Sequence, residues 1–247
     1  MVFLIAFATL VATLLGGAFA IKYSDKLHLI LGFSAGAVVG VAFFDLLPEA
    51  IELTGGATHN HRTIMTILAV GFIVYMILDR VIAAMSDLQI EEGSREGDHH
   101  TGHHHTGRLG AVALVVHSFL DGLGIGLAFQ VSAAVGAIVA VAVLVHDFSD
   151  GINTVNLVLR GNGDKKGAFH WLIADAVAPV IGVLAGSAFA LPPEKLGMVL
   201  ALFAGFFLYI GASDLLPESH HRHPKPWTTV STVLGMIVIY VAIMLAG

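Results

Sequence analysis

Residues 111–159 read AVALVVHSFLDGLGIGLAFQVSAAVGAIVAVAVLVHDFSDGINTVNLVL, two apolar runs separated by only a few residues around 130–133. Each run has about the 20 residues that an α-helix needs to cross the hydrocarbon core of a bilayer. A short connection between two such helices makes them antiparallel neighbours. The stretch therefore predicts a hairpin of two membrane-spanning helices.

Both helices of this hairpin carry the pattern His-x-x-x-Asp, first at His117 and Asp121 and then, 29 residues later, at His146 and Asp150. Residues four apart lie on one face of a helix, so each helix presents an imidazole and a carboxylate in the same direction. The two histidines are about equally far from the turn, and we expect their rings to face each other. The two carboxylates should then lie about one helical turn to either side of the imidazoles.

The composition of the whole chain is typical of a membrane protein. Of its 247 residues, 56% are hydrophobic and only 12% are charged. Eight apolar runs of about 20 residues recur along the chain; they cover residues 2–21, 27–51, 64–85, 111–130, 133–159, 168–191, 196–216 and 227–246. We therefore expect an all-α polytopic membrane protein with a single transmembrane domain over residues 1–247. The absence of cysteine excludes thiolate metal ligands and disulfides.

Basic residues predict the orientation of these spans. Cytoplasmic loops carry an excess of Lys and Arg, and with the N-terminus outside only Arg62 and Lys195 of the twelve basic residues fall on the outer side. Both termini are therefore expected outside a plasma or inner membrane. The first run has no basic leader and no clear cleavage site, so we interpret it as a retained span and not as a signal peptide.

Several acidic residues lie within the apolar runs, while nearly every basic residue lies in a loop or at the end of a run. A charged residue at the centre of a bilayer costs roughly 2.5–3.5 kcal/mol on insertion scales, so these carboxylates need protons or metal cations to compensate them. Protonation or helix capping is the alternative, above all for the first and last of the set. The acids are Asp45, Asp121, Asp147, Asp150, Asp175 and Asp214.

Two imidazoles and two carboxylates suit a borderline divalent ion such as Zn²⁺, with Fe²⁺, Mn²⁺ and Cd²⁺ as alternatives. A single histidine within a membrane is more often a packing residue than a ligand, but two matched pairs at His117–Asp121 and His146–Asp150 favour a metal site. We expect the metal to be bound as a substrate, with no cofactor acting as a catalyst.

A five-residue string, Asp-Leu-Leu-Pro-Glu, occurs in the second run at Asp45–Glu49 and again in the seventh at Asp214–Glu218. The second span should run outward and the seventh inward, so the two copies should lie at opposite membrane faces. Inverted repeats around a site at the midplane are typical of alternating-access transporters. Asp45 and Glu49 would then lie near the outer mouth, and Asp214 and Glu218 near the inner one. A proline-terminated helix end with an interfacial acid is the simpler interpretation of each copy alone.

Taken together, these motifs resemble those of the ZIP family of divalent metal transporters over essentially the whole chain. The resemblance rests on His117–Gly122, which reads HSFLDG, on His146–Gly151, which reads HDFSDG, and on the histidine-rich segment before them. It implies eight spans with both termini outside and a metal site built from the fourth and fifth helices. It also allows a homodimer, as do the small residues on the helix faces.

The resemblance implies a primary site of His117, Asp121, His146 and Asp150. Family members usually have glutamates where this chain has aspartates, and asparagine where it has Ser118. Many members also have a second site completed by a glutamate before a proline in the sixth helix. Here Ala178 precedes Pro179, and Asp175 lies one turn earlier, so a second site would take Ser118, Asp147 and Asp175.

The segment 86–108 between the third and fourth runs is expected to be a histidine-rich cytoplasmic loop. Its mixture of acids and histidines is consistent with disorder and weak metal capture, although a merely solvated loop has the same composition. The histidines are His99, His100, His103, His104 and His105.

The sequence therefore predicts a transporter that takes a divalent transition metal, with Zn²⁺ favoured, across the bilayer into the cytoplasm. No phosphate-binding loop is present, and neither an enzymatic activity nor a nucleic-acid partner is expected. The alternative from another class is an intramembrane zinc hydrolase, in which one aspartate acts as a base. A bis-histidine haem protein is a third alternative, but it leaves the carboxylates unexplained.

Overall fold

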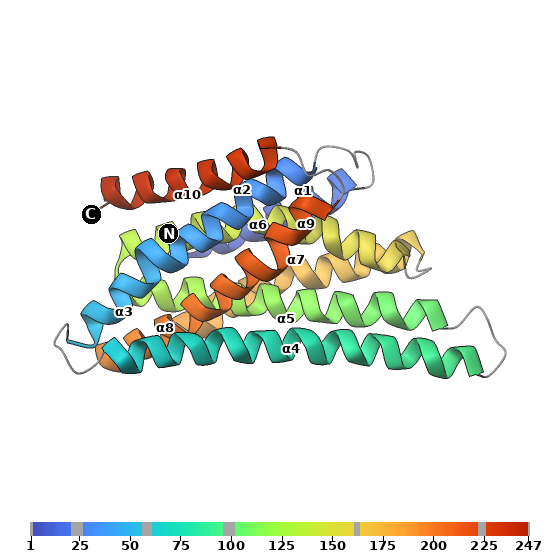
Figure 1. Cartoon of the computed structure of the whole chain (residues 1–247), viewed down its shortest axis with the longest axis horizontal. Helices are drawn as coiled ribbons and strands as arrows, with labels where there is room; N and C mark the ends of the chain where they lie inside the picture. The colour runs from blue at the N-terminus through green and yellow to red at the C-terminus, as the bar shows by residue number, and fades with distance from the viewer. Residues whose placement is uncertain are drawn as a thin grey trace.

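The computed structural model describes residues 2–20, 27–55, 61–95, 102–160, 164–221 and 226–246, and the regular structure in these ranges is helical throughout. The elements run approximately parallel to the long axis of the molecule (Figure 1). They are α1 (Val2–Ala20), α2 (Leu27–Val41), η1 (Ala42–Leu46), α3 (Leu47–Leu53), α4 (His61–Arg95), α5 (Gly102–Val131), α6 (Ala133–Arg160), α7 (Lys165–Ala188), α8 (Pro193–Tyr209), η2 (Ile210–Leu215), α9 (Leu216–His221) and α10 (Pro226–Ala246).

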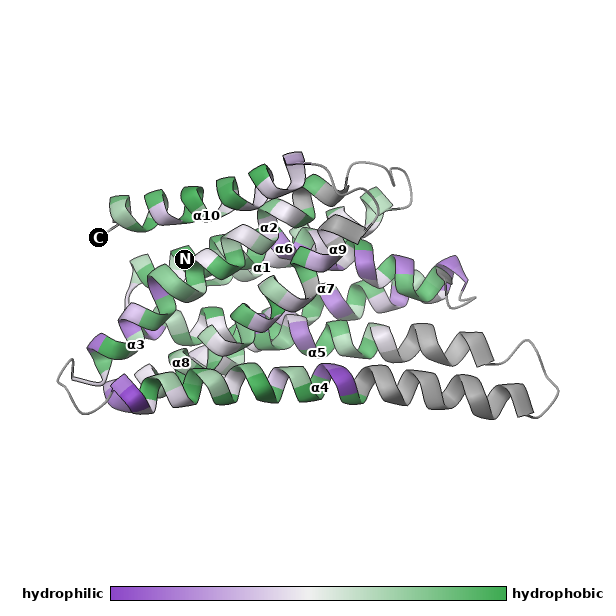
Figure 2. Cartoon of the chain, viewed as in Figure 1, coloured by the Kyte–Doolittle hydropathy of each residue, from purple (hydrophilic) through white to green (hydrophobic). Residues whose placement is uncertain are grey.

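Eight helical stretches among the described residues are long and apolar enough to cross a membrane, which confirms the predicted all-α fold with eight spans. Each predicted run corresponds to one span, with α2, η1 and α3 forming the second and α8, η2 and α9 the seventh. Hydrophobic residues cover most of the helix surfaces, and hydrophilic residues gather mainly at helix ends (Figure 2). The structure does not contain a membrane, so which end of the molecule faces the cytoplasm stays a prediction.

The predicted hairpin of the fourth and fifth spans is formed by α5 and α6. Only Ser132 separates the two helices, and its hydroxyl accepts a hydrogen bond from the backbone N–H of Val135 at 3.1 Å. This bond caps the first turn of α6, where backbone donors have no partner within the helix. The tight turn fixes the two helices side by side in one register.

The second and seventh spans pack antiparallel, as an inverted repeat requires. Ala50, near the end of the second span, lies against Gly197 at the start of the seventh, and Ala35 lies against Gly211 near the end of the seventh. The two copies of Asp-Leu-Leu-Pro-Glu therefore lie toward opposite ends of the second span; in Figure 1, α3 lies at the left end of the molecule and α9 lies just right of its centre.

A π-helical segment precedes the proline in each copy of the repeat. Leu47 donates its N–H to the carbonyl of Ala42, and Leu216 donates its own to Gly211, five residues back in both cases. The next residue is a proline, which lacks an N–H and clashes with the carbonyl four residues earlier in a regular α-helix. The wider π turn accommodates this ring, and such turns are frequent at functional sites.

Four pairs of helices approach so closely that only glycine fits between them, as small residues allow in membrane proteins. In each pair, a glycine of one helix lies against a backbone carbonyl of its partner, and a glycine of the partner does the same in return. The pairs of glycines are Gly16 with Gly151, Gly36 with Gly235, Gly71 with Gly205, and Gly122 with Gly182.

Together with further contacts, these glycine pairs group the spans into two sets: α1 also lies against α7 and α5 against α6, whereas the second span also lies against the seventh. The pairs α1–α6 and α5–α7 belong to a first set of four spans, and the pairs α2–α10 and α4–α8 belong to a second. We call these the first and second helix sets. The hairpin with both His-x-x-x-Asp patterns lies in the first set, and both π segments lie in the second.

Substitutions of two glycines that lie one turn apart on α2 test how closely this helix packs against α10. A Cβ on Gly36 would lie 1.8 Å from the carbonyl oxygen of Thr232, whereas a Cβ on Gly40 would meet nothing closer than Ile239 Cγ2 at 3.4 Å. We expect Gly36→Ala to destabilise the protein by about 1–3 kcal/mol through overpacking. Gly40→Ala should leave the melting temperature in detergent unchanged or raised, because alanine favours a helix. Equal melting temperatures for the two variants would contradict the close approach.

Candidate metal centre

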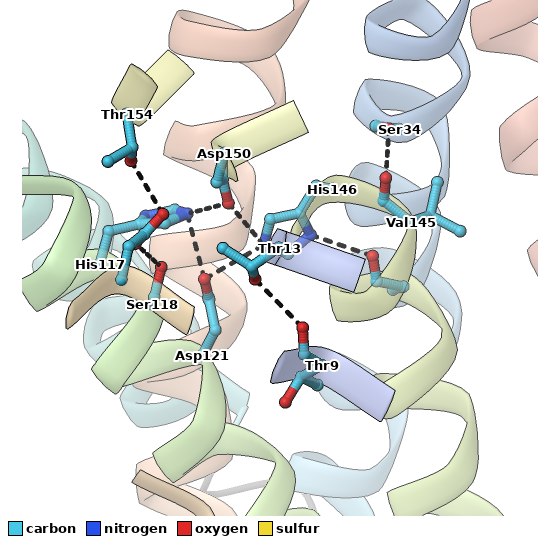
Figure 3. Close-up of polar contacts among 12 residues, drawn as sticks. Thr9, Thr13, Ser34, His117, Ser118, Asp121, Val145, His146, Asp150 and Thr154 are labelled. Carbon is cyan, nitrogen blue, oxygen red and sulfur yellow. Dashed lines mark hydrogen bonds and ion pairs between the residues drawn. The ribbon is translucent and has the colours of Figure 1, made fainter. Parts of the chain in front are cut away.

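The structure brings His117, Asp121, His146 and Asp150 together in the middle of the first helix set. One ligand atom from each residue lies within 4.8 Å of all the others. Asp121 Oδ2 lies 3.0 Å from His117 Nε2 and 3.1 Å from His146 Nε2, while Asp150 Oδ2 lies 3.4 Å and 3.9 Å from the same atoms (Figure 3). Both imidazoles therefore point the same nitrogen at the same two carboxylates.

The sequence spacing predicts that the carboxylates lie one helical turn away from the imidazoles. In the structure they lie beside the imidazoles instead. Side chains on a helix lean toward its N-terminus, so Asp121 reaches back toward His117 and Asp150 toward His146. Because α5 and α6 are antiparallel, the two carboxylates approach from opposite directions and meet at one level. The direction of the side chains thus turns two separate pairs into one cluster.

The ring of His146 is held by its own helix. Its Nδ1 lies 3.0 Å from the carbonyl oxygen of Ala142, one turn back along α6. A carbonyl can only accept a hydrogen bond, so Nδ1 carries the proton and Nε2 of the neutral ring presents a lone pair to the cluster. This is the tautomer that a metal ligand needs.

The ring of His117 is held from another helix. Its Nδ1 is hydrogen-bonded to the hydroxyl of Tyr75 on α4, in the second helix set. Its Nε2 is the nitrogen nearest both carboxylates, so both histidines offer the same atom.

The cluster is closed to solvent and rich in negative charge. His146 is 0% exposed, Asp121 1%, Asp150 3% and His117 6%. Among the described residues, no lysine or arginine forms an ion pair with either carboxylate. Nε2 of each imidazole lies about 3 Å from Asp121 Oδ2, and a proton or a divalent cation between these atoms would compensate the buried negative charge.

The distances suit a tetrahedral ion. Zn²⁺ takes nitrogen and carboxylate ligands at about 2.0–2.2 Å, which puts neighbouring ligand atoms about 3.3–3.6 Å apart in a tetrahedron. The four nitrogen–oxygen separations of 3.0, 3.1, 3.4 and 3.9 Å bracket that value. A small contraction around an ion would complete the geometry.

The residues expected to form a second site lie nearby but form a different arrangement. Asp175 on α7 is fully buried and accepts hydrogen bonds from Ser118 Oγ at 2.7 Å and from Thr154 Oγ1 at 2.8 Å. Both oxygens of Asp147 are buried and have no hydrogen-bond partner among the described residues. Asp175 is thus satisfied by two hydroxyls, whereas Asp147 is not.

Asp45 and Glu49 line a cavity of about 330 Å³ at the end of the second span. Glu52 and Ser132 also line it, so three carboxylates lie beside the turn of the hairpin. Asp45 is buried, and its Oδ2 has no hydrogen-bond partner among the described residues. The side chains of the equivalent acids, Asp214 and Glu218, lie outside the described part of the structure.

Helix covers much of the segment that the sequence predicts as a loop. The third span continues to Arg95 as α4, and α5 begins at Gly102, eight residues before the apolar stretch of the fourth span at Gly110. His103, His104 and His105 belong to the first turn of α5, but their side chains lie outside the described residues, as do His99 and His100 entirely.

Several residues near the site escape sequence reasoning. They include Tyr75, Thr154 and Glu52, and also Ser34, which donates a hydrogen bond at 3.0 Å to the carbonyl of Val145 beside His146. Only Glu52 carries a signal in the sequence, since it lies one turn beyond Glu49 on the same helix face. The others are ordinary polar residues whose importance depends on which helices become neighbours.

Comparison with known proteins gives a consistent result. The family model described as ZIP zinc transporter matches residues 89–246. The zinc transporter ZupT of Corynebacterium aurimucosum is 30% identical over 246 residues, which cover 95% of this chain and 92% of the relative. ZupT of Streptococcus mutans is 27% identical over 92% of this chain and 90% of its own. The zinc transporter GufA of Myxococcus xanthus is 28% identical over 88% and 86%.

The two aspartates of the cluster should contribute unequally to metal binding. Asp121 Oδ2 lies about 3 Å from both imidazole nitrogens, whereas Asp150 Oδ2 is farther from each. We expect Asp121→Asn to weaken Zn²⁺ binding more than Asp150→Asn, because it removes the charge that both histidines share. Equilibrium dialysis of the purified variants measures this order. An equal loss, or a larger loss for Asp150→Asn, would mean that the metal does not centre on Asp121.

Proposed function

This chain belongs to the ZIP family of zinc transporters, and on that premise we propose that it carries divalent transition-metal ions, mainly Zn²⁺, across the membrane into the cytoplasm. The observation that supports the proposal best is the buried cluster of His117, Asp121, His146 and Asp150, whose four ligand atoms lie within 4.8 Å of one another. The metal is the substrate here. Cd²⁺, Fe²⁺ and Mn²⁺ are the other candidates for the same ligands.

Family membership also decides between the classes of function. ZIP proteins are transporters and not enzymes, so the intramembrane hydrolase is excluded as the function of this chain. Eight apolar helices together with this family make the chain a multi-pass membrane protein.

We propose that the four residues bind the ion as a tetrahedral set and that Ser118, Asp147 and Asp175 form an adjoining second site. Asp147 supports this role because its two oxygens are buried without a hydrogen-bond partner among the described residues. Asp175 would have to exchange its bonds from Ser118 and Thr154 for a metal ion. The primary site needs no such exchange, so we expect it to fill first.

Alternating access would use the inverted repeat and the two helix sets. Asp45 and Glu49 line a cavity at one end of the molecule and would collect incoming ions, while Asp214 and Glu218 would face the opposite mouth. The glycine contacts join spans within each set, so a shift of one set against the other leaves those contacts intact. Such a shift would open the site to one mouth at a time.

The distribution of charge supports an orientation of the spans, and the membrane potential supports a direction of transport. Cytoplasmic loops carry the positive excess, and this supports an arrangement with both termini outside and residues 86–108 on the cytoplasmic side of the single ZIP-like domain 1–247. The histidines of that segment could capture ions that leave the site. An inside-negative membrane potential contributes about 2.3 kcal/mol per charge for every 100 mV, and about twice that for a divalent ion.

Metal flux into proteoliposomes tests the function. We expect saturable uptake of Zn²⁺ by the intact protein and none by the variant with both His117→Ala and His146→Ala, because the remaining carboxylates cannot replace two nitrogen ligands. The matched control is His170→Ala, which removes an exposed histidine of α7 whose one hydrogen bond among the described residues is to the carbonyl of Lys166. Its uptake should equal that of the intact protein.

Two results would count against the proposal. Tight Zn²⁺ binding without any flux in the intact protein would make the cluster a structural site. Flux that survives the loss of both histidines would place the pathway elsewhere in the bundle.

The acidic cavity makes a separate prediction about the capture of ions. Asp45→Asn keeps the shape of the buried side chain but removes its charge, and a cleft with less negative charge concentrates fewer cations. We expect the half-saturating Zn²⁺ concentration to rise about tenfold. Glu194→Gln, which neutralises an exposed acid in the first turn of α8, is the control. Similar shifts in both variants would reduce the effect to general surface charge.

A further inference from the structure

The two histidines of the cluster are oriented by different kinds of partner. Nδ1 of His146 faces a carbonyl of its own helix, so its ring is set by the local geometry of α6. Nδ1 of His117 faces the hydroxyl of Tyr75, which belongs to α4 and to the other helix set. The orientation of His117 therefore depends on a contact between the two sets.

The hydroxyl of Tyr75 differs from a carbonyl in the hydrogen bonds that it can form. A tyrosine hydroxyl both donates and accepts hydrogen bonds, whereas a carbonyl oxygen only accepts. When Nε2 of His117 binds a metal, Nδ1 carries the proton and donates it to Tyr75. When Nε2 instead donates its proton to a carboxylate, Tyr75 can donate to Nδ1. The same bond can thus form with an ion bound or absent, as long as the two helix sets keep this relative position.

Aromatic packing fixes the ring that carries this hydroxyl. The Tyr75 ring centroid lies 5.5 Å from those of Phe206 and Tyr209 on α8, and 6.0 Å from that of His117. Tyr209 in turn donates a hydrogen bond to Asp79 Oδ2 at 2.8 Å. Tyr75 is thus held by α8 as well as by its own helix, and its hydroxyl has a defined place beside His117.

We propose that Tyr75 is a positioning residue that holds His117 with Nε2 toward the metal, and thereby sets the affinity of the site from the second helix set. The consequence for transport rests on the proposed function, but the consequence for metal binding does not. Partners that orient a metal-binding histidine typically change metal affinity by 10- to 100-fold when they are removed.

The test is Tyr75→Phe, which removes the hydroxyl and retains the packed ring. Tyr209→Phe is the matched control, since it removes from the same aromatic cluster a hydroxyl whose hydrogen bond goes to Asp79 on α4. We expect Tyr75→Phe to raise the half-saturating Zn²⁺ concentration for uptake by about 10- to 100-fold and to leave the maximal rate within about twofold. Tyr209→Phe should change neither.

Two further measurements separate positioning from stability and from transport. Titration of the purified proteins with Co²⁺, followed by its visible absorption, should show the same loss of affinity in Tyr75→Phe and a normal spectrum in Tyr209→Phe. Melting temperatures without metal should be alike for both variants, because the rings remain. Nitrogen-15 NMR of the metal-loaded wild-type protein should show Nε2 of His117 bound to metal and Nδ1 protonated.

Each contrary result has a distinct meaning. Equal Zn²⁺ and Co²⁺ affinities in wild type and Tyr75→Phe would overturn the positioning role, and so would equal losses in Tyr75→Phe and Tyr209→Phe or metal on Nδ1 in the wild type. If the wild type binds Co²⁺ but moves no Zn²⁺, the proposed function fails, and the comparison of Co²⁺ affinities still decides the role of Tyr75. A wild type that binds neither ion would overturn both proposals.

Discussion

Two carboxylates and two imidazoles meet in the interior of a bundle of apolar helices. The rest of the structure depends on this burial of negative charge. Asp121 and Asp150 have no lysine or arginine as an ion-pair partner among the described residues, and they are almost inaccessible to water. Such a cluster costs free energy unless a proton or cation compensates it. A site of this kind suits a transporter, because its uncompensated negative charge attracts a divalent cation and the cation neutralises that charge when it binds.

Close packing between helix backbones fixes the relative positions of the four side chains in this cluster. Within a membrane, helices gain little from burying apolar surface against one another and associate mainly through close contact. Here glycines on both members of four helix pairs allow that contact, and they do so within two sets of spans. The ligands lie in the first set, whereas Tyr75 and Ser34 reach them, or their backbone, from the second. The boundary between the sets therefore passes directly beside the metal centre.

The repeated Asp-Leu-Leu-Pro-Glu string shapes the backbone of two spans, and its first copy also supplies acids to a cavity. In both copies the proline follows a π-helical turn, which relieves the clash that its ring would cause in a regular helix. The first copy also supplies Asp45 and Glu49 to the acidic cavity beside the hairpin turn. One local solution to a proline within a span thus shapes the backbone in both copies of the repeat, and the acids of the first copy line the cavity.

The sequence by itself determined the number of spans, the hairpin of α5 and α6, the inverted repeat, and the convergence of both His-x-x-x-Asp pairs. Helical spacing and a one-residue turn are local constraints, and they leave these four side chains little freedom. Tertiary structure alone decided that Asp175 pairs with Ser118 and Thr154. It also decided that Tyr75 orients toward His117 while His146 relies on its own helix. These contacts join residues far apart in the chain, and no local spacing encodes which helices become neighbours or how closely their backbones approach.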